Sequence, residues 1–280
     1  MTDGSDLAWL GLEHQDDGRW SFELTSDLSR HDGKLYGGTG IATMVAVMEA
    51  ETARDTLWAT VQFAGSADIG ERIDCRVEVL AGGHRTSQIR FTATVETPAG
   101  GDGVGDRIVL AGIGATGLPR SVPLEVQVGT MPDVGGPEEG GAWGSMSSAW
   151  TDSARASSWL AIAEMRQIEV GDGQVAIWAR MREQRQTRAT IGFLADMVPS
   201  SVARAAGRMG GGTSLDNSVR FGREVDTEWI LLDFDPWFAT GGYLHGGARV
   251  WATDGTLLAF ASQTAAAMVW PPPGVELPSS

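Results

Sequence analysis

The chain has 280 residues, of which 42% are hydrophobic and 20% are charged, a composition that excludes disorder of the whole chain. Its 38 glycines are about twice the usual share of about 7% and favour many turns over a helical bundle. The formal net charge of −15 repels nucleic-acid backbones and anionic membrane surfaces, so we expect no nucleic-acid partner and no membrane partner.

The first half of the sequence predicts one helix followed by several strands. An extended segment at residues 20–24 precedes the pair Gly37-Gly38, which permits a tight turn into a helix. Strict alternation of apolar and polar residues then predicts an antiparallel pair of strands at 73–79 and 89–95, followed by a third strand at 107–115. The helix is marked by apolar residues spaced i, i+3, i+4 and i+7, which are Ile41, Met44, Val45 and Met48.

The same order of elements recurs in the second half, which indicates an internal repeat. An extended segment at 174–181 precedes a second apolar helix, and the hairpin dipeptide Asp254-Gly255 joins the last two predicted strands. The helix is marked by Ile191, Leu194, Ala195, Val198 and Val202, and the strands are predicted at 213–221, 229–235, 242–252 and 256–268. Residues 117–148 are rich in glycine and proline and have little periodicity, which is typical of a linker.

A helix too apolar to be exposed can be buried if an antiparallel sheet curls around it. Two such units in one chain predict an α+β fold of the double-hotdog type, with two antiparallel sheets each curled around a central helix. We expect an N-terminal unit at residues 1–116, a linker at 117–160 and a C-terminal unit at 161–280.

Several common signals are missing from the sequence. The single cysteine, Cys75, cannot form an internal disulfide, and the first residues lack the features of a signal peptide, so we expect a cytoplasmic protein. The sequence contains no dinucleotide-binding, phosphate-loop or zinc motif. Its four histidines are scattered. We therefore expect no cofactor and no metal.

Four segments together resemble the acyl-CoA thioesterase II family, double-hotdog enzymes that hydrolyse acyl-CoA thioesters. The first half contributes a Gly-Gly pair before its helix, and the second half contributes a helix with an embedded Asp and two strands. The resemblance covers most of residues 20–270, and the order and spacing of the segments carry it. The segments are KLYGGTGIATMVAVMEA, TIGFLADMVPSS, SLDNSVRF and DGTLLAFASQTAAAM.

The resemblance implies a site for hydrolysis of a thioester by water. It places the water-orienting carboxylate on Asp196, the hydroxyl on Ser214 and the amide on Gln263. Such a reaction needs a positioned water, a proton acceptor and donors for the developing oxyanion. Backbone N–H groups at the start of a central helix suit the last role, so Gly37 and Gly38 are candidate substrate-binding residues, and no covalent intermediate is required.

The sequence departs from the family pattern at two positions. Ser214 stands where the family usually has Thr, and Asn217 stands where it usually has His. The first change keeps the hydroxyl, whereas the second puts the pocket wall and the catalytic rate in doubt. Binding of the coenzyme A phosphates requires local positive charge. The candidates for this role are Arg85, Arg220 and Arg223, with Arg188 and Arg249 as further arginines.

Other interpretations stay open. Asp196 would serve equally as the N-cap of a helix with Pro199 in its first turn, and Gln263 would suit an edge strand facing water. Asp216 is interpreted as structural. A non-catalytic acyl or acyl-CoA binding protein is one alternative function. A hotdog hydratase or dehydratase is another, although its active-helix motifs are missing. The expected partner is an acyl-CoA substrate, and the oligomeric state is open, a homo-oligomer included.

The two halves differ in the residues that would form a site. Alignment of the final strands by their Leu-Ala pairs puts Ala115 opposite Gln263, and alignment of the helices by their Met-Val pairs puts Thr43 opposite Asp196. The sequence therefore predicts that only the cleft furnished by the second half is catalytic. We expect release of CoA from at least one medium or long acyl-CoA without added metal.

Overall fold

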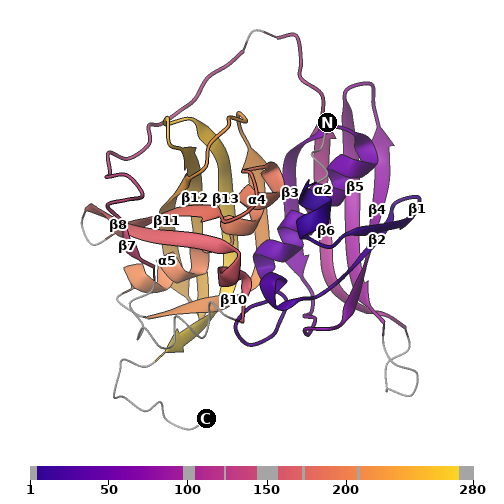
Figure 1. Cartoon of the computed structure of the whole chain (residues 1–280), viewed down its shortest axis with the longest axis horizontal. Helices are drawn as coiled ribbons and strands as arrows, with labels where there is room; N and C mark the ends of the chain where they lie inside the picture. The colour runs from indigo at the N-terminus through magenta and orange to yellow at the C-terminus, as the bar shows by residue number, and fades with distance from the viewer. Residues whose placement is uncertain are drawn as a thin grey trace.

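The computed structural model describes residues 5–96, 105–122, 124–143, 157–171, 174–206 and 209–270. In its N-terminal half, a long helix lies against a group of antiparallel strands (Figure 1). The helices of this half are α1 (Ser5–Trp9), the 3-10 helix η1 (Ser26–Leu28) and α2 (Gly37–Thr52). Its strands are β1 (Glu13–Asp16), β2 (Arg19–Glu23), β3 (Asp55–Phe63), β4 (Arg72–Gly82), β5 (Thr86–Val95) and β6 (Arg107–Gly117).

The C-terminal half repeats this arrangement with two shorter helices. Its helices are the 3-10 helix η2 (Trp159–Ala161), α4 (Arg188–Leu194) and α5 (Val198–Ala205). Its strands are β7 (Gly141–Ala142), β8 (Ala163–Gly171), β9 (Gln174–Met181), β10 (Met209–Phe221), β11 (Ile230–Thr240), β12 (Tyr243–Ala252) and β13 (Leu257–Trp270).

The described strands of both halves form one hydrogen-bonded sheet. Its order is β1-β2-β4-β5-β6-β3 in the N-terminal half and β10-β13-β12-β11-β9-β8-β7 in the C-terminal half. Strands β3 and β10 pair in antiparallel fashion and join the halves, with Thr60 opposite Ser218. The antiparallel strands and few helices confirm the predicted α+β class, and the two predicted sheets are continuous through this central pair.

Helix α2 is buried over nearly its whole length, because every residue from Gly37 to Glu49 is buried. A helix that is apolar on all sides needs cover on all sides. The sheet of its own half covers one side, and α4 of the other half packs against it. Helix α5 packs against β10, β11, β12 and β13. The two halves therefore share a core that includes residues of α2 and α4, and Figure 1 shows these two helices near the junction of the halves.

The structure corrects one predicted element and adds others. The single helix predicted through Ile191 and Val202 is two helices, since α4 ends at Leu194 and α5 begins at Val198. Pro199 lies in the first turn of α5, where its missing N–H is tolerated, whereas the same residue would interrupt a continuous helix. The sequence analysis does not predict strands β1, β3, β7 and β8. The break between α4 and α5 leaves Asp196 outside both helices.

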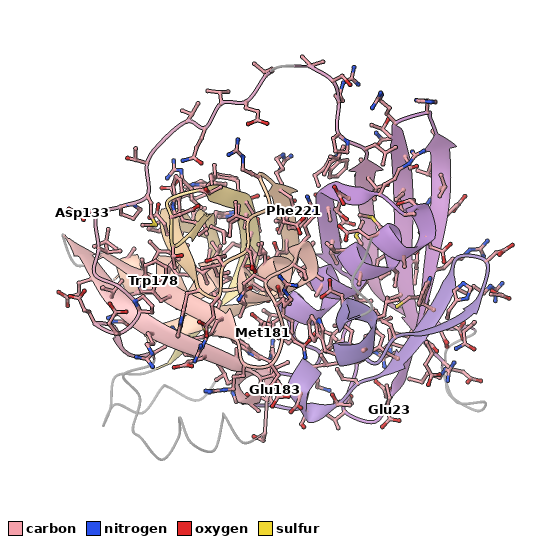
Figure 2. All side chains as sticks on the ribbon, turned by 45° about the horizontal axis from the view of Figure 1, so that its top comes forward. Glu23, Asp133, Trp178, Met181, Glu183 and Phe221 are labelled. Carbon is pink, nitrogen blue, oxygen red and sulfur yellow. The ribbon has the colours of Figure 1, made fainter. Side chains whose placement is uncertain are left out.

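Part of the predicted linker packs against the C-terminal half. Met131 and Val134 pack against a buried cluster that includes Trp178, and the indole Nε1 of Trp178 donates a hydrogen bond to the Gly135 carbonyl oxygen at 2.9 Å. Figure 2 shows Asp133 and Trp178 on the same flank of the molecule. Of the helices in the described ranges, none has the length and apolar character needed to cross a membrane.

Candidate active site

The three residues assigned to catalysis by resemblance meet in one hydrogen-bonded network. Asp196 lies in the break between α4 and α5 and is only 9% exposed. Its Oδ1 accepts a hydrogen bond from Asn217 Nδ2 at 2.8 Å and another from Gln263 Nε2. The same Gln263 amide also donates to Ser214 Oγ at 2.7 Å. Asn217 is therefore a fourth member of the network.

A β-bulge in β10 makes this network possible. Ser214 and Asn217 are an odd number of residues apart, so a regular strand would direct their side chains to opposite faces. The pairing of β10 with β13 shifts register between Ser214 and Asp216, which leaves Leu215 as the extra residue. The bulge restores both side chains to one face. Gln263 is directly opposite Asn217 on β13 and completes the group.

Asp216 has the structural role that the sequence indicates. Its Oδ1 accepts a hydrogen bond from the backbone N–H of Thr264 at 2.8 Å, at the place where the bulge interrupts the ladder. A backbone donor without a partner would cost free energy. Asp216 therefore stabilises the bulge and takes no part in the network around Asp196.

The carboxylate of Asp196 faces the N-terminus of α2. A hydrogen bond from the backbone N–H of Gly38 is among the interactions of this carboxylate. A Cβ atom at Gly37 would lie 2.4 Å from Asp196 Oδ2, and one at Gly38 would lie 2.2 Å from the Phe193 carbonyl oxygen. Neither glycine has a positive φ. The Gly-Gly pair is thus required by the close approach of Asp196 and α4, and not by backbone geometry at the turn.

Asp196 is not a helix cap. The N-cap of α5 is Met197, and no side chain caps that helix. Burial raises the pKa of Asp196 to about 7, even though hydrogen bonds from Asn217, Gln263 and Gly38 and the charge of Arg30 lower it. A carboxyl with a pKa near neutrality is suited to accept and return a proton.

Tyr36 connects the two sides of the site. Its hydroxyl donates to the backbone carbonyl oxygens of Phe193 at 3.1 Å and Asp196 at 3.4 Å. Its ring stacks on Trp159, with centroids 4.4 Å apart and an interplanar angle of 6°. Burial raises the pKa of Tyr36 well above its usual value, so the phenol stays protonated and holds the loop between α4 and α5.

A pocket of about 190 Å³ opens in front of Asp196 and Ser214. One part of its lining is polar and contains the cationic Arg30 together with His31. The rest is mainly apolar and aromatic. The apolar side chains are Leu35, Tyr36, Phe63, Trp143, Trp159, Met197, Pro199 and Met268, and the remaining lining residues are Gly37, Gly65, Ser66, Ser200, Gly211, Gly212 and Thr213.

The arginines expected to bind phosphate do not line this pocket. Arg85 donates to the Pro119 carbonyl oxygen at 2.7 Å, Arg220 is exposed on β10, and Arg223 forms an ion pair with Glu125. The further candidates are also placed elsewhere, since Arg188 pairs with Asp55 and Glu224 and Arg249 lies on β12 opposite Asp233.

The arginine of the pocket is Arg30, which the sequence analysis missed. Its guanidinium forms an ion pair with Asp32. It belongs to an irregular loop before α2, where no periodicity singles out a residue. Within the described ranges, no group of three or more His, Cys, Asp or Glu side chains is placed to hold a metal ion.

The arrangement of strands and helices is that of hotdog proteins. A hotdog-fold protein of unknown function from Alicyclobacillus acidocaldarius aligns with a TM-score of 0.76 and 20% identity, over 97% of this chain and 100% of the other. Residues 24–111 match the family model of the acyl-CoA thioesterase N-terminal domain, and residues 127–267 match that of the C-terminal domain. The chain belongs to this acyl-CoA thioesterase family.

Solved structures of thioesterases are also similar. A provisionally assigned thioesterase from Novosphingobium aromaticivorans is 27% identical with a TM-score of 0.78, over 91% of this chain and 97% of the other. The acyl-CoA thioesterase II TesB2 from Mycobacterium marinum is 17% identical with a TM-score of 0.71, over 96% and 100%. At this lower identity the likeness concerns the fold alone. No curated protein gives a significant match.

Proposed function

We propose that the chain is a double-hotdog acyl-CoA thioesterase that hydrolyses acyl-CoA to a free acid and CoA by direct attack of water. In this proposal residues 1–116 and 161–280 are the two hotdog units, joined by 117–160. The observation that carries the proposal is the buried Asp196, which is held by Gln263 and Asn217 and lines the same pocket as Ser214. Membership of the acyl-CoA thioesterase family supports it.

The contacts of the network assign a role to each side chain. Because Gln263 Nε2 donates to Ser214 Oγ, the hydroxyl hydrogen of Ser214 is available to donate to a water in the pocket. Ionised Asp196 accepts a proton from that water as its oxygen bonds to the thioester carbonyl carbon. Collapse of the tetrahedral intermediate breaks the carbon–sulfur bond, and the departing thiolate takes the proton back from Asp196. The acid and CoA are released without an acyl-enzyme.

The oxyanion is stabilised at the start of α2. The first N–H groups of a helix have no intrahelical acceptor and carry partial positive charge. The Gly38 N–H interacts with Asp196, which leaves the Gly37 N–H to face the carbonyl oxygen. Gly37 lines the pocket, and it has no side chain that would obstruct the approach of the thioester.

The phosphates of CoA are bound beside Arg30. An acidic protein with a net charge of −15 binds an anion where positive charge is concentrated. Arg30 and His31 are the basic residues that line the pocket, and Arg30 is near enough to lower the pKa of Asp196. This assignment replaces the arginines that the sequence analysis selected.

Thiol release from a panel of acyl-CoAs tests the proposal. We expect release of free CoA by the wild-type chain in the presence of EDTA, and a kcat reduced by about 100-fold or more in Asp196→Asn, as expected for loss of a general base. Loss of activity with a chelator and its return with a divalent ion would contradict the metal-free mechanism. Binding of acyl-CoA without thiol release would favour the non-catalytic alternative.

A further inference from the structure

We propose that the acyl group accepted by this pocket is compact, about the size of a benzene ring, and that Trp159 and Tyr36 form the wall that limits its length. This inference rests on the proposed thioesterase function and specifies its substrate class. It departs from the expectation of a medium or long acyl chain that followed from the sequence.

The volume of the pocket sets the first limit. The pocket that contains Asp196 and Ser214 measures about 190 Å³. Clefts that hold drug-sized ligands are usually about 300–1,000 Å³, whereas an engineered apolar cavity of about 150 Å³ binds benzene. The thioester carbonyl must also reach Asp196 within this space, and the arm of CoA that leads to Arg30 takes part of it, because Arg30 lines the same pocket. A phenyl ring or a chain of a few carbons therefore fits, and a long fatty acyl chain does not.

The second limit is a group of aromatic side chains that closes one end of the pocket. Tyr36 and Trp159 line the pocket and are only 5% and 7% exposed. Behind them, the fully buried Phe193 packs edge-on against both rings, with centroids 5.1 and 5.9 Å away. Trp9 packs edge-on against Phe193 in turn, at 5.2 Å. A row of aromatic side chains thus occupies the space between α2 and α4 through which a long chain would extend.

This wall is also held in place by hydrogen bonds. The backbone N–H of Trp159 donates to the Ser29 carbonyl oxygen at 2.9 Å, and the Tyr36 hydroxyl donates to the Phe193 carbonyl oxygen at 3.1 Å. The first bond fixes the backbone of Trp159, and displacement of the Tyr36 ring would break the second. Displacement of either ring would open a cavity in the core, which is costly. Trp159 and Tyr36 therefore form a fixed wall.

The chemistry of the lining favours an aromatic or short branched acyl group. Phe63 and Trp143 add two further aromatic side chains to those of Tyr36 and Trp159. Aromatic rings interact favourably in offset and edge-to-face arrangements beyond the burial of their area. Two further cavities lined by described residues contain neither Asp196 nor any of these aromatic residues.

The decisive experiment is a profile of kcat/KM over butanoyl-, hexanoyl-, benzoyl-, phenylacetyl-, dodecanoyl- and hexadecanoyl-CoA, each below its micelle-forming concentration. We expect the best compact substrate to exceed hexadecanoyl-CoA by about tenfold or more, since pocket fit of one or a few carbons is worth about 10–200-fold. A maximum at dodecanoyl- or hexadecanoyl-CoA would overturn the inference and leave the thioesterase proposal intact. Absence of thiol release from every substrate would instead contradict the thioesterase proposal.

Variants of the wall then test the assigned residues. Trp159→Leu, or Trp159→Ala where it folds, should move the maximum toward longer chains by at least two carbons. Trp143→Ala changes a half-buried residue of the lining and should destabilise the core less than a change of Trp159. It should also move the maximum toward longer chains. The matched control is Trp237→Ala on β11, where the side chain is 48% exposed and the profile should stay unchanged. An unchanged profile in the Trp159 variant that folds would show that Trp159 does not set the chain length.

Discussion

Thr60 on β3 and Ser218 on β10 are opposite each other where the two halves meet, with their hydroxyl oxygens 2.8 Å apart. The strands on either side of this pair are arranged alike. The pairing of β3 with β6 shifts register at Leu57, and the pairing of β10 with β13 shifts register at Leu215. The two bulges are the same number of residues before Thr60 and Ser218. The halves are therefore related by a local twofold axis through this pair.

This relationship identifies the counterparts of the site residues in the first half. Asn217 is opposite Gln263 in the C-terminal half, and the corresponding Ala59 is opposite Gly114 in the N-terminal half. The counterpart of Gln263 is thus Gly114, and not Ala115 as the alignment of Leu-Ala pairs predicts. A Cβ at Gly114 would lie 2.9 Å from Met48 Sδ, so a methionine occupies the space of the amide.

The pH dependence of the reaction follows from the pKa of Asp196, which burial raises to about 7. Since the ionised carboxylate accepts the proton, we expect kcat/KM to rise with pH, to level off above about pH 7 and to fall about tenfold per pH unit well below it. A profile of kcat/KM from pH 5 to 9 measures this. A rising limb centred near pH 4, the ordinary range of an aspartate, would contradict the assignment of Asp196 as the base.

The same pKa predicts an effect on stability with a defined sign. The folded chain binds the Asp196 proton more tightly than the unfolded chain, whose Asp pKa is about 3.9. The stabilisation from this proton is therefore fully present below about pH 4 and is lost as the pH rises through about 7. Urea unfolding of wild type and Asp196→Asn should be measured at pH 5 and at pH 8. We expect the free energy of unfolding of the variant, relative to that of the wild type, to be higher at pH 8 than at pH 5. Equal differences at both pH values would contradict the raised pKa.

Gly37→Ala tests the space around the carboxylate. The added Cβ would lie 2.4 Å from Asp196 Oδ2, so either the carboxylate or the start of α2 must move. We expect kcat to fall by about tenfold or more, because displacement of a reacting group by about 1 Å can cost about 100-fold. Gly141→Ala is the control, since its Cβ would meet no atom within 4 Å. Equal activity of the two variants would place the reacting centre away from Gly37.

Arg30→Ala tests the phosphate site. At about pH 9, where Asp196 is ionised with or without the Arg30 charge that lowers its pKa, we expect KM for an acyl-CoA to rise about tenfold with kcat nearly unchanged, as for an interaction made equally in the ground and transition states. The KM for the corresponding acyl-pantetheine, which has no phosphate, should stay the same. Arg220→Ala, on the exposed side of β10, is the control. A KM that responds to Arg220→Ala and not to Arg30→Ala would restore the assignment made from sequence.

The asymmetry of the halves predicts one catalytic site per chain. A buried carboxylate of the first half, that of Glu49, accepts a hydrogen bond from the backbone N–H of Thr56 at 2.8 Å. We expect Glu49→Gln, which preserves an acceptor for that N–H, and Thr43→Val to keep thiol release within about threefold of wild type, because surrounding polar contacts change little. The double variant Asp196→Asn with Gln263→Ala should lose thiol release.

Titration with a non-hydrolysable acyl-CoA analogue should count a single site in the wild-type chain. Thiol release that survives the double variant and depends on Thr43 or Glu49 would place the active site in the first half.

The sequence predicts most strands because apolar and polar residues alternate along them, and it predicts helix α2 because large apolar residues recur there at helical spacing. It does not separate α4 from α5, since Ile191, Leu194, Val198 and Val202 continue an apolar pattern across the break. The positions of Asn217 and Arg30 in the site cannot be predicted from a periodic pattern of polar and apolar residues. Asn217 enters the network because a bulge reverses the alternation after Ser214, and Arg30 reaches the pocket from an irregular loop. A one-residue bulge cannot be located from alternation of polarity alone.

Because β3 pairs with β10, the site does not depend on an intact peptide chain between the two halves. Asp196 is held against α2 by tertiary contacts, and the halves are joined by strand pairing and by the packing of α2 on α4. The peptide segment between β6 and β7 runs over the surface, with Val126 78% exposed. A protease cut there would leave two fragments that stay associated and form a complete site.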